Sequence, residues 1–320
     1  MLLWECCYFR ELHLWDEERP LHQNFIIVMS RKQKKRLALF HFGAQAAARY
    51  RDGDSSLYFC PICKAGFPKS AAETGLITLE HVPPERIGGK ELLLTCSRCN
   101  ATAGHTVDAA LDRRTLIKEF SETIGGKGNH HLRRVLLGMG GLQLTTELSR
   151  SDETINIKVI QKANNPQVIK DASEPGLLSD GDEIKLSMSI KTYEHAKLSD
   201  LKSAFLLVTA LFGYKYAFDP LLDKVREQIR NPDKDLLGMR YKIDFPEGTL
   251  PSQSILRVIK PTYFYFVVFQ HYGIVLPSLD SPFDLNNILN QQQEQEGQFA
   301  VKWDWRFQWP HRLMMIFDFD

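Results

Sequence analysis

The sequence predicts an α+β protein, made of a small metal-stapled ββα unit followed by a larger α+β domain. Two Cys-x-x-Cys pairs frame a short segment in the first half of the chain. Between and after them, the hydrophobic pattern predicts a strand, a loop, a second strand and a helix, in that order. Beyond residue 130, strands and helices alternate irregularly, which is typical of an α+β domain. The length of 320 residues is enough for both parts.

Residues 1–56 are predicted to form an N-terminal extension and a basic helix. The segment Met29-Ser30-Arg31-Lys32 resembles a natural protein start, so we expect residues 1–28 to be an upstream extension with no signal peptide. Residues 31–51 carry seven basic side chains and no acidic one, and their middle favours a helix. Two interpretations stay open: a helix that binds phosphates, or a basic tail that only aids solubility.

The four cysteines of the two pairs, Cys60, Cys63, Cys96 and Cys99, indicate a structural zinc site, because four thiolates in two short pairs suit a tetrahedral ion. The 32 residues between the pairs exceed the spacing of a simple zinc ribbon. A disulfide framework fits poorly in a chain of this length without a secretory signal, and a redox motif needs only one pair. Zinc would therefore clamp the two ends of an inserted segment.

The inserted segment has the pattern of a hairpin followed by a helix. Residues 78–82 predict a strand that Pro83 and Pro84 must end, since proline cannot donate to a strand ladder. Gly88 and Gly89 allow a turn, and residues 92–95 predict the return strand. Helical spacing of apolar residues then runs over 100–111. The module bounded by these elements is expected to cover residues 57–125.

These motifs carry a resemblance to a known family. Residues 58–112 contain the sequences Leu79-Glu80-His81-Val82-Pro83-Pro84, Gly88-Gly89 and Cys99-Asn100 between and after the cysteine pairs. Together they resemble the HNH endonucleases of the subtype whose ββα-metal site is held by a four-cysteine zinc knuckle. The resemblance implies a metal-dependent enzyme that hydrolyses DNA phosphodiester bonds, and it suggests a role in bacterial or phage defence.

The resemblance also implies roles for individual residues. His81 corresponds to the general base, a task that suits a side chain with a pKa near neutrality. Glu80 corresponds to the metal-binding acid and Asn100 to the second ligand, so that one Mg²⁺ or Mn²⁺ would stabilise the leaving oxygen. A structural role for His81 and a helix-capping role for Asn100 remain alternatives.

Three further residues complete or complicate this assignment. His105 could complete the shell of the catalytic ion, which would admit Ni²⁺ or Zn²⁺, or it could contact phosphate. Asp108 could brace a ligand from behind. The middle Asn of the family pattern falls near Glu91, where this chain has no Asn. This departure leaves open what orients His81, although a backbone carbonyl could hold its Nδ1.

Charge and hydropathy set the expected partners and location. The net charge is only +1, yet residues 86–134 hold nine basic side chains against five acidic ones, which favours DNA as the partner of this region. The longest clearly apolar run, residues 205–212, is too short to span a membrane. We therefore expect a cytoplasmic protein with no membrane partner. The oligomeric state does not follow from the sequence.

Residues 130–320 are predicted to be a separate α+β accessory domain of unknown role. We expect a loop over 161–182, a long helix that opens at Ser199 or Asp200 and stops at Gly213, and a helix that starts at Asp219-Pro220. Strands are predicted by alternation and β-branched residues over 142–146, 154–159, 184–192, 254–259, 263–269 and 301–309. The last of these is rich in Trp and Phe, which indicates either one face of a core or a platform for stacked bases.

Two functions from different classes follow from the sequence. The first is a zinc-stapled HNH endonuclease with Glu80, His81, Asn100 and His105 in its site. The alternative is a zinc-ordered module that binds nucleic acid or a protein partner and whose nuclease site has decayed, for which the missing middle Asn is the best support.

Overall fold

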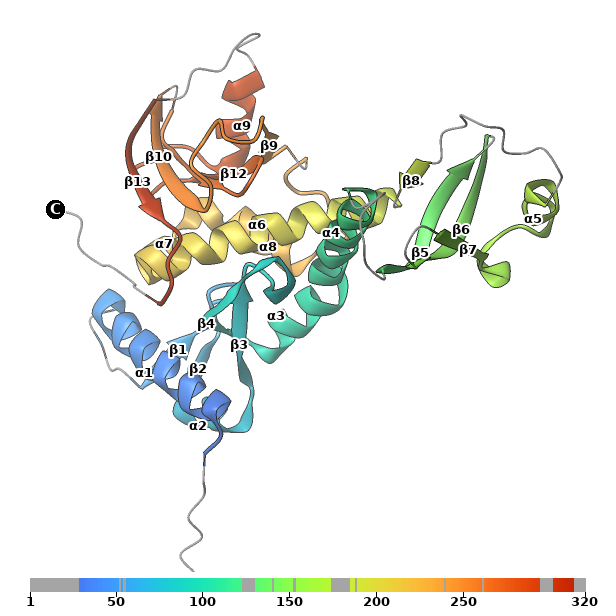
Figure 1. Cartoon of the computed structure of the whole chain (residues 1–320). Helices are drawn as coiled ribbons and strands as arrows, with labels where there is room; N and C mark the ends of the chain where they lie inside the picture. The colour runs from blue at the N-terminus through green and yellow to red at the C-terminus, as the bar shows by residue number, and fades with distance from the viewer. Residues whose placement is uncertain are drawn as a thin grey trace, which may run out of the picture.

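The computed structural model describes residues 29–313 apart from 52, 54–55, 123–129, 140, 152–153, 174–184, 188, 239, 261 and 294–301. The predicted extension over 1–28 lies outside these described residues. A long central helix, α6 (Ile190–Phe212), separates two parts of the molecule (Figure 1). The N-terminal module lies on one side of it, a five-stranded sheet on the other, and a smaller sheet projects beyond one end.

The N-terminal module begins with the basic helix α1 (Arg31–Arg51), which confirms the predicted helix. Its other elements are β1 (Leu57–Phe59), β2 (Gly66–Pro68), α2 (Lys69–Thr74), β3 (Ile77–Val82), η1 (Glu85–Ile87), β4 (Lys90–Cys96), α3 (Ser97–Thr102), the π-helical turn η2 (Ala103–Asp108) and α4 (Ala109–Glu122). Strands β1 and β2 pair antiparallel, and so do β3 and β4. The predicted order of strand, loop, strand and helix is therefore confirmed.

The helix after β4 begins three residues earlier than predicted and is not uniform. The Cys96 sulfur accepts a hydrogen bond from the backbone N–H of Cys99 and so caps α3 at its start. Sequence spacing placed the helix start at Asn100, because a cysteine is not among the usual capping residues. The π-helical turn then joins α3 to α4, in the segment that carries His105 and Asp108.

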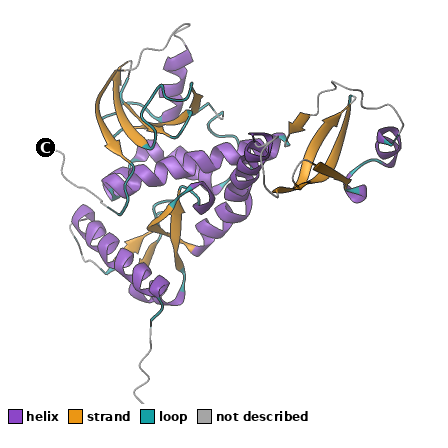
Figure 2. Ribbon diagram, in the orientation of Figure 1, coloured by secondary structure: helices purple, strands orange, loops and turns teal. Residues whose placement is uncertain are grey.

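The smaller sheet has four strands in the order β7-β6-β5-β8 (Figure 2). Its elements are β5 (His130–Met139), β6 (Leu142–Ser151), β7 (Thr154–Val159), η3 (Gln161–Ala163), α5 (Pro166–Ala172) and β8 (Lys185–Ser187). The predicted strands over 142–146 and 154–159 are confirmed. The predicted loop over 161–182 is wrong where it holds α5, because Asn165 caps that helix and Pro166 takes its first position.

Helix α6 and the five-stranded sheet complete the fold. The sheet has the order β13-β10-β11-β12-β9 and is antiparallel throughout. The elements after α6 are α7 (Tyr214–Ala217), η4 (Pro220–Leu222), α8 (Asp223–Arg230), β9 (Lys242–Asp244), β10 (Ser254–Lys260), β11 (Phe264–Val268), β12 (Tyr272–Pro277), α9 (Leu285–Gln293) and β13 (Lys302–Gln308). The predicted helix stop at Gly213, the helix start at Asp219-Pro220 and the three late strands are confirmed.

The start of α6 was predicted wrongly. The helix opens at Ile190, where Ser189 accepts a hydrogen bond from the Thr192 backbone N–H, so the strand expected over 184–192 ends at Ser187. Ser199 and Asp200 resemble capping residues in sequence, but they lie in the middle of the helix and are fully buried. Their side chains bond to residues of the N-terminal module instead.

One hydrophobic core joins most of the chain. It runs from Phe40 of α1 through the module and α6 to the five-stranded sheet and Leu313. A separate small cluster around Phe120 and Leu132 stabilises the four-stranded sheet. The division at residue 130 stays a prediction, but α6 and the five-stranded sheet share their core with the module.

The aromatic strand β13 contributes to this core. Trp305 lies 5.9 Å and Phe307 6.0 Å from Phe212 of α6, measured between ring centroids. These contacts support the core-face interpretation over the stacking platform. Among the described helices, none has a stretch long and apolar enough to cross a membrane.

Candidate functional site

Four cysteine sulfurs converge at the edge of the module. The β1–β2 hairpin presents Cys60 and Cys63, while the junction of β4 and α3 presents Cys96 and Cys99. All four Sγ atoms lie within 4.8 Å of one another, and Cys63 Sγ is 3.7 Å from Cys96 Sγ. Zn–S bonds of about 2.3 Å in a tetrahedron hold the sulfurs about 3.8 Å apart, so this geometry fits a structural zinc.

Interactions among the four thiols shift their pKa values in both directions, down for Cys63 and Cys96 and up for Cys60 and Cys99. All four are free cysteines rather than disulfides. Hydrogen bonding with Cys60 lowers the pKa of the Cys96 thiol to about 7. The Cys96 backbone N–H also points at Cys60 Sγ, with the nitrogen 3.4 Å away. The cluster is tied to the rest of the protein nearby, because Tyr214 of α7 bonds through its hydroxyl to both backbone groups of Phe59.

His81 lies on β3 in a shallow cleft on the side of the hairpin that faces α1. About a third of its side chain is exposed, and its Nε2 is 3.9 Å from a carboxylate oxygen of Glu85 and from one of Glu91. Glu91 is the cross-strand partner of His81. The position near which the family pattern has its middle Asn is thus occupied by a carboxylate that faces the candidate base.

The cleft at His81 is edged by cations and has a volume of about 330 Å³. Its basic lining residues are Lys35 of α1, Lys90 of β4, and His311 and Arg312 after β13. Lys35 forms an ion pair of 2.8 Å with Glu91. The hydrogen bond with Lys35 is the main cause that lowers the pKa of Glu91, so this carboxylate stays charged beside His81.

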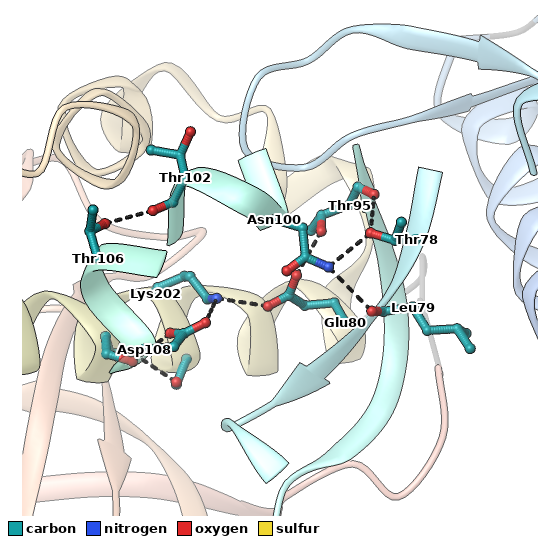
Figure 3. A network of polar contacts seen from close by, with 11 residues as sticks. Thr78, Leu79, Glu80, Thr95, Asn100, Thr102, Thr106, Asp108 and Lys202 are labelled. Carbon is teal, nitrogen blue, oxygen red and sulfur yellow. Dashed lines mark hydrogen bonds and ion pairs between the residues drawn. The ribbon is translucent and has the colours of Figure 1, made fainter. Parts of the chain in front are cut away.

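Glu80 points away from this cleft into the protein interior. Glu80 and His81 point apart because a strand places successive side chains on opposite faces. The register of β3 and β4 also shifts between these two residues. Glu80 is only 3 % exposed. Its Oε2 accepts a hydrogen bond of 2.6 Å from the Thr95 hydroxyl, and its Oε1 is 2.7 Å from the ammonium of Lys202 (Figure 3).

Lys202 reaches this position from the middle of α6. It is 1 % exposed, and its Nζ also donates to Asp108 Oδ2 at 2.6 Å. Burial alone would lower the pKa of Lys202, but the carboxylates of Glu80 and Asp108 raise it above the ordinary value. The residue is therefore a buried ammonium held between two carboxylates.

Sequence reasoning missed Lys202. Ser199, Asp200, Lys202 and Ser203 are all buried, and this run of polar residues directly before the apolar stretch 204–208 was the available signal. It did not identify the partner, because Glu80 lies more than a hundred residues away in the chain.

Asn100 lies on α3, and its side chain is next to that of Glu80 on β3 (Figure 3). Its Nδ2 donates to the Thr78 hydroxyl at 2.8 Å and to the Leu79 carbonyl at 3.4 Å. Because Cys96 caps α3, the capping alternative for Asn100 is wrong. The amide oxygen is left as the acceptor on the side opposite these two bonds.

Of the two remaining predicted residues, Asp108 lies near Glu80 and His105 does not. Asp108 comes close to Glu80 through their shared contact with Lys202, and its Oδ1 accepts a hydrogen bond of 2.7 Å from Ser199. His105 is exposed on the π-helical turn. Within the described part of the chain, the four cysteines are the one group of three or more His, Cys, Asp or Glu side chains whose ligand atoms converge. His105 and Glu80 are therefore not brought together in such a group.

The arrangement around Glu80 does not fit a divalent ion as it stands. Both carboxylate oxygens are engaged, one with Thr95 and one with Lys202. An ion at this carboxylate would lie against a buried ammonium, and two cations in a medium of low dielectric constant repel strongly. The predicted catalytic ion on Glu80, Asn100 and His105 thus stays a prediction.

Comparison with known proteins adds one finding. Residues 60–116 match the family model described as HNH endonuclease. This match confirms the predicted resemblance of the module to HNH endonucleases, and the four-cysteine cluster, which could hold a zinc ion, lies within the matched residues. No curated protein and no solved structure matches the chain.

Proposed function

We propose, from the HNH endonuclease module of residues 60–116, that this protein hydrolyses phosphodiester bonds in DNA. The observation that carries the proposal is the position of His81, which is partly exposed in a cleft lined by basic side chains and faces two carboxylates. A phosphate diester is an anion, so the basic side chains that line this cleft suit it.

The chemistry assigned to His81 is general base catalysis. Its imidazole accepts a proton from a water molecule, which attacks phosphorus opposite the leaving 3′ oxygen. The imidazolium formed in this step lies 3.9 Å from Glu91 and Glu85, whose negative charges stabilise it. A bound Mg²⁺ or Mn²⁺ would supply charge stabilisation at the leaving oxygen, as the family resemblance implies.

Helix α1 is proposed to hold the DNA backbone next to this cleft. Lys32 and Lys34 are exposed on its first turns, and Lys35 reaches Glu91 at the edge of the cleft. A phosphate chain that follows α1 would therefore lead to His81. A role in bacterial or phage defence rests on the family resemblance alone.

A second function is favoured by one specific observation. The oxygens of Glu80 are occupied by Lys202 and Thr95, which is the arrangement expected of a site that no longer binds a catalytic ion. In that case the module would be a zinc-ordered nucleic-acid-binding or interaction module without nuclease activity.

Cleavage of supercoiled plasmid separates the two functions. The unaltered protein should nick or linearise the plasmid with Mn²⁺ or Mg²⁺, and His81→Ala should abolish cleavage while DNA binding and zinc content stay unchanged. His271→Ala is the matched control, because this histidine lies at the turn between β11 and β12, outside the cleft. Full cleavage by His81→Ala would assign the activity elsewhere. DNA binding without any cleavage by the unaltered protein would favour the second function.

A further inference from the structure

Helix α6 delivers a positive charge into the interior of the HNH module. Two carboxylates of the module contact the Lys202 ammonium, Glu80 from β3 and Asp108 from the end of the π-helical turn. Asn100 from α3 lies beside Glu80. Two carboxylates and an amide oxygen are a set of hard oxygen donors that suits Mg²⁺ or Mn²⁺. In this structure the two carboxylates neutralise the ammonium of Lys202 instead.

We propose that Lys202 competes with a divalent cation for the Glu80 carboxylate, so that docking of α6 weakens binding of the ion at Glu80. An ion can bind Glu80 once Lys202 withdraws. This inference rests on the proposed function for the identity of the site, and it gives the C-terminal part of the chain a role: α6 controls metal loading.

The burial of the pair explains why withdrawal of the lysine requires a movement of α6. Lys202 and Glu80 are both almost fully buried, so a lysine that merely changed rotamer would leave an unpaired ammonium in the protein interior. Helix α6 is also held to the module by Asp200, which accepts two hydrogen bonds, of 2.8 and 2.9 Å, from Arg114 of α4. Asp200 also accepts a hydrogen bond from Tyr272 of β12. The lysine is thus fixed by contacts on both sides of α6.

The first arm of the test uses the unaltered chain. Binding of Mn²⁺ to the zinc-loaded protein is followed by electron paramagnetic resonance of the free ion and compared with binding to Glu80→Gln. If Lys202 holds Glu80, both proteins bind Mn²⁺ equally weakly. A site in the unaltered protein that Glu80→Gln abolishes would overturn the proposal, because Glu80 would then be an available ligand.

The second arm removes the competitor. Lys202→Met replaces the ammonium with an apolar chain of similar length and should tighten Mn²⁺ binding about tenfold or more. The gain should vanish in the double variant with Glu80→Gln. Arg114→Met is the matched control, because it removes another cation that pairs with α6, while Asp200 still has Lys242 at 3.9 Å. It should leave Mn²⁺ binding unchanged.

The two arms keep the inference separate from the proposed function. Zinc content and circular dichroism establish that each variant is folded, and if Lys202→Met does not fold, the first arm decides alone. Folded Lys202→Met with no gain in Mn²⁺ affinity would overturn the competition. Since neither arm measures cleavage, a Lys202→Met variant that gains an ion site yet cleaves no plasmid would contradict the nuclease proposal and support the competition.

Discussion

Two clusters of acidic or thiol side chains in the module differ in the source of the cation that balances their negative charge. At the zinc knuckle, four cysteine sulfurs converge within 4.8 Å, and their hydrogen bonds among the described residues are to one another and to backbone N–H groups. At Glu80, two carboxylates converge on the ammonium of Lys202. Converging anions need a cation, which must come from solution at the first cluster and comes from α6 at the second. The difference teaches that closely spaced ligand residues do not by themselves identify a site that holds a metal.

Removal of the zinc should have the largest effect. A structural zinc contributes on the order of 10 kcal/mol to the folding of small zinc modules. Cys96→Ser should therefore lose about one zinc per chain and unfold the module. Because the module shares its core with α6 and the five-stranded sheet, we expect the melting temperature of the whole chain to fall as well.

Metal analysis and thermal unfolding test this prediction, with Ser97→Ala as the neighbouring control that touches no sulfur. A purified protein without zinc that unfolds at the same temperature as the zinc-loaded form would contradict it.

Breaking the buried ion pairs should have the next largest effect. Loss of one partner of a buried pair costs about 3–5 kcal/mol, so Lys202→Met and Arg114→Met should lower the free energy of unfolding by similar amounts. They should differ when Mn²⁺ is added. An ion at a hundred times its dissociation constant returns about 2.7 kcal/mol to Lys202→Met, whereas Arg114→Met should regain nothing.

Urea unfolding of both variants with and without Mn²⁺ measures this difference. Equal recovery in the two variants would indicate that the ion binds elsewhere, and the comparison between the two clusters would lose its basis.

The exposed lysines of α1 should have the smallest effect. If Lys32 and Lys34 contact phosphates, changing both to Gln should reduce the slope of log affinity against log salt by up to about 2. The matched control changes Lys162 of η3 and Lys170 of α5, beside the four-stranded sheet, to Gln. It should leave the slope unchanged. Equal slopes for all three proteins between 50 and 200 mM salt would favour the solubility interpretation of the basic segment.

Features encoded by neighbouring residues could be predicted from the sequence. The cysteine pairs, the hairpin of β3 and β4 and the stop of α6 at Gly213 each depend on a few adjacent side chains, so their patterns were sufficient. The start of α6 could not be predicted in this way. Ser199 and Asp200 resemble caps in sequence, and their bonds to Asp108 and Arg114 exist only in the folded protein.

The proximity of Glu80 and Asn100 could be predicted from the sequence, but the charge that neutralises Glu80 could not. The motif placed Glu80 and Asn100 side by side, as the structure has them. It could not anticipate that a lysine from α6 neutralises Glu80, because this contact joins segments that are distant in the chain. His81 and Glu80 were assigned to one site, yet the hairpin directs them to opposite faces, since neighbouring strand residues alternate.

The most direct test of the central claim is the position of the two cations in crystals of the zinc-loaded protein soaked in Mn²⁺. Anomalous diffraction should show one zinc peak among the four cysteine sulfurs, and no manganese peak at Glu80 of the unaltered chain. Lys202→Met crystals should add a manganese peak at Glu80. A manganese peak at Glu80 in the unaltered protein, with Lys202 in place on α6, would contradict the account.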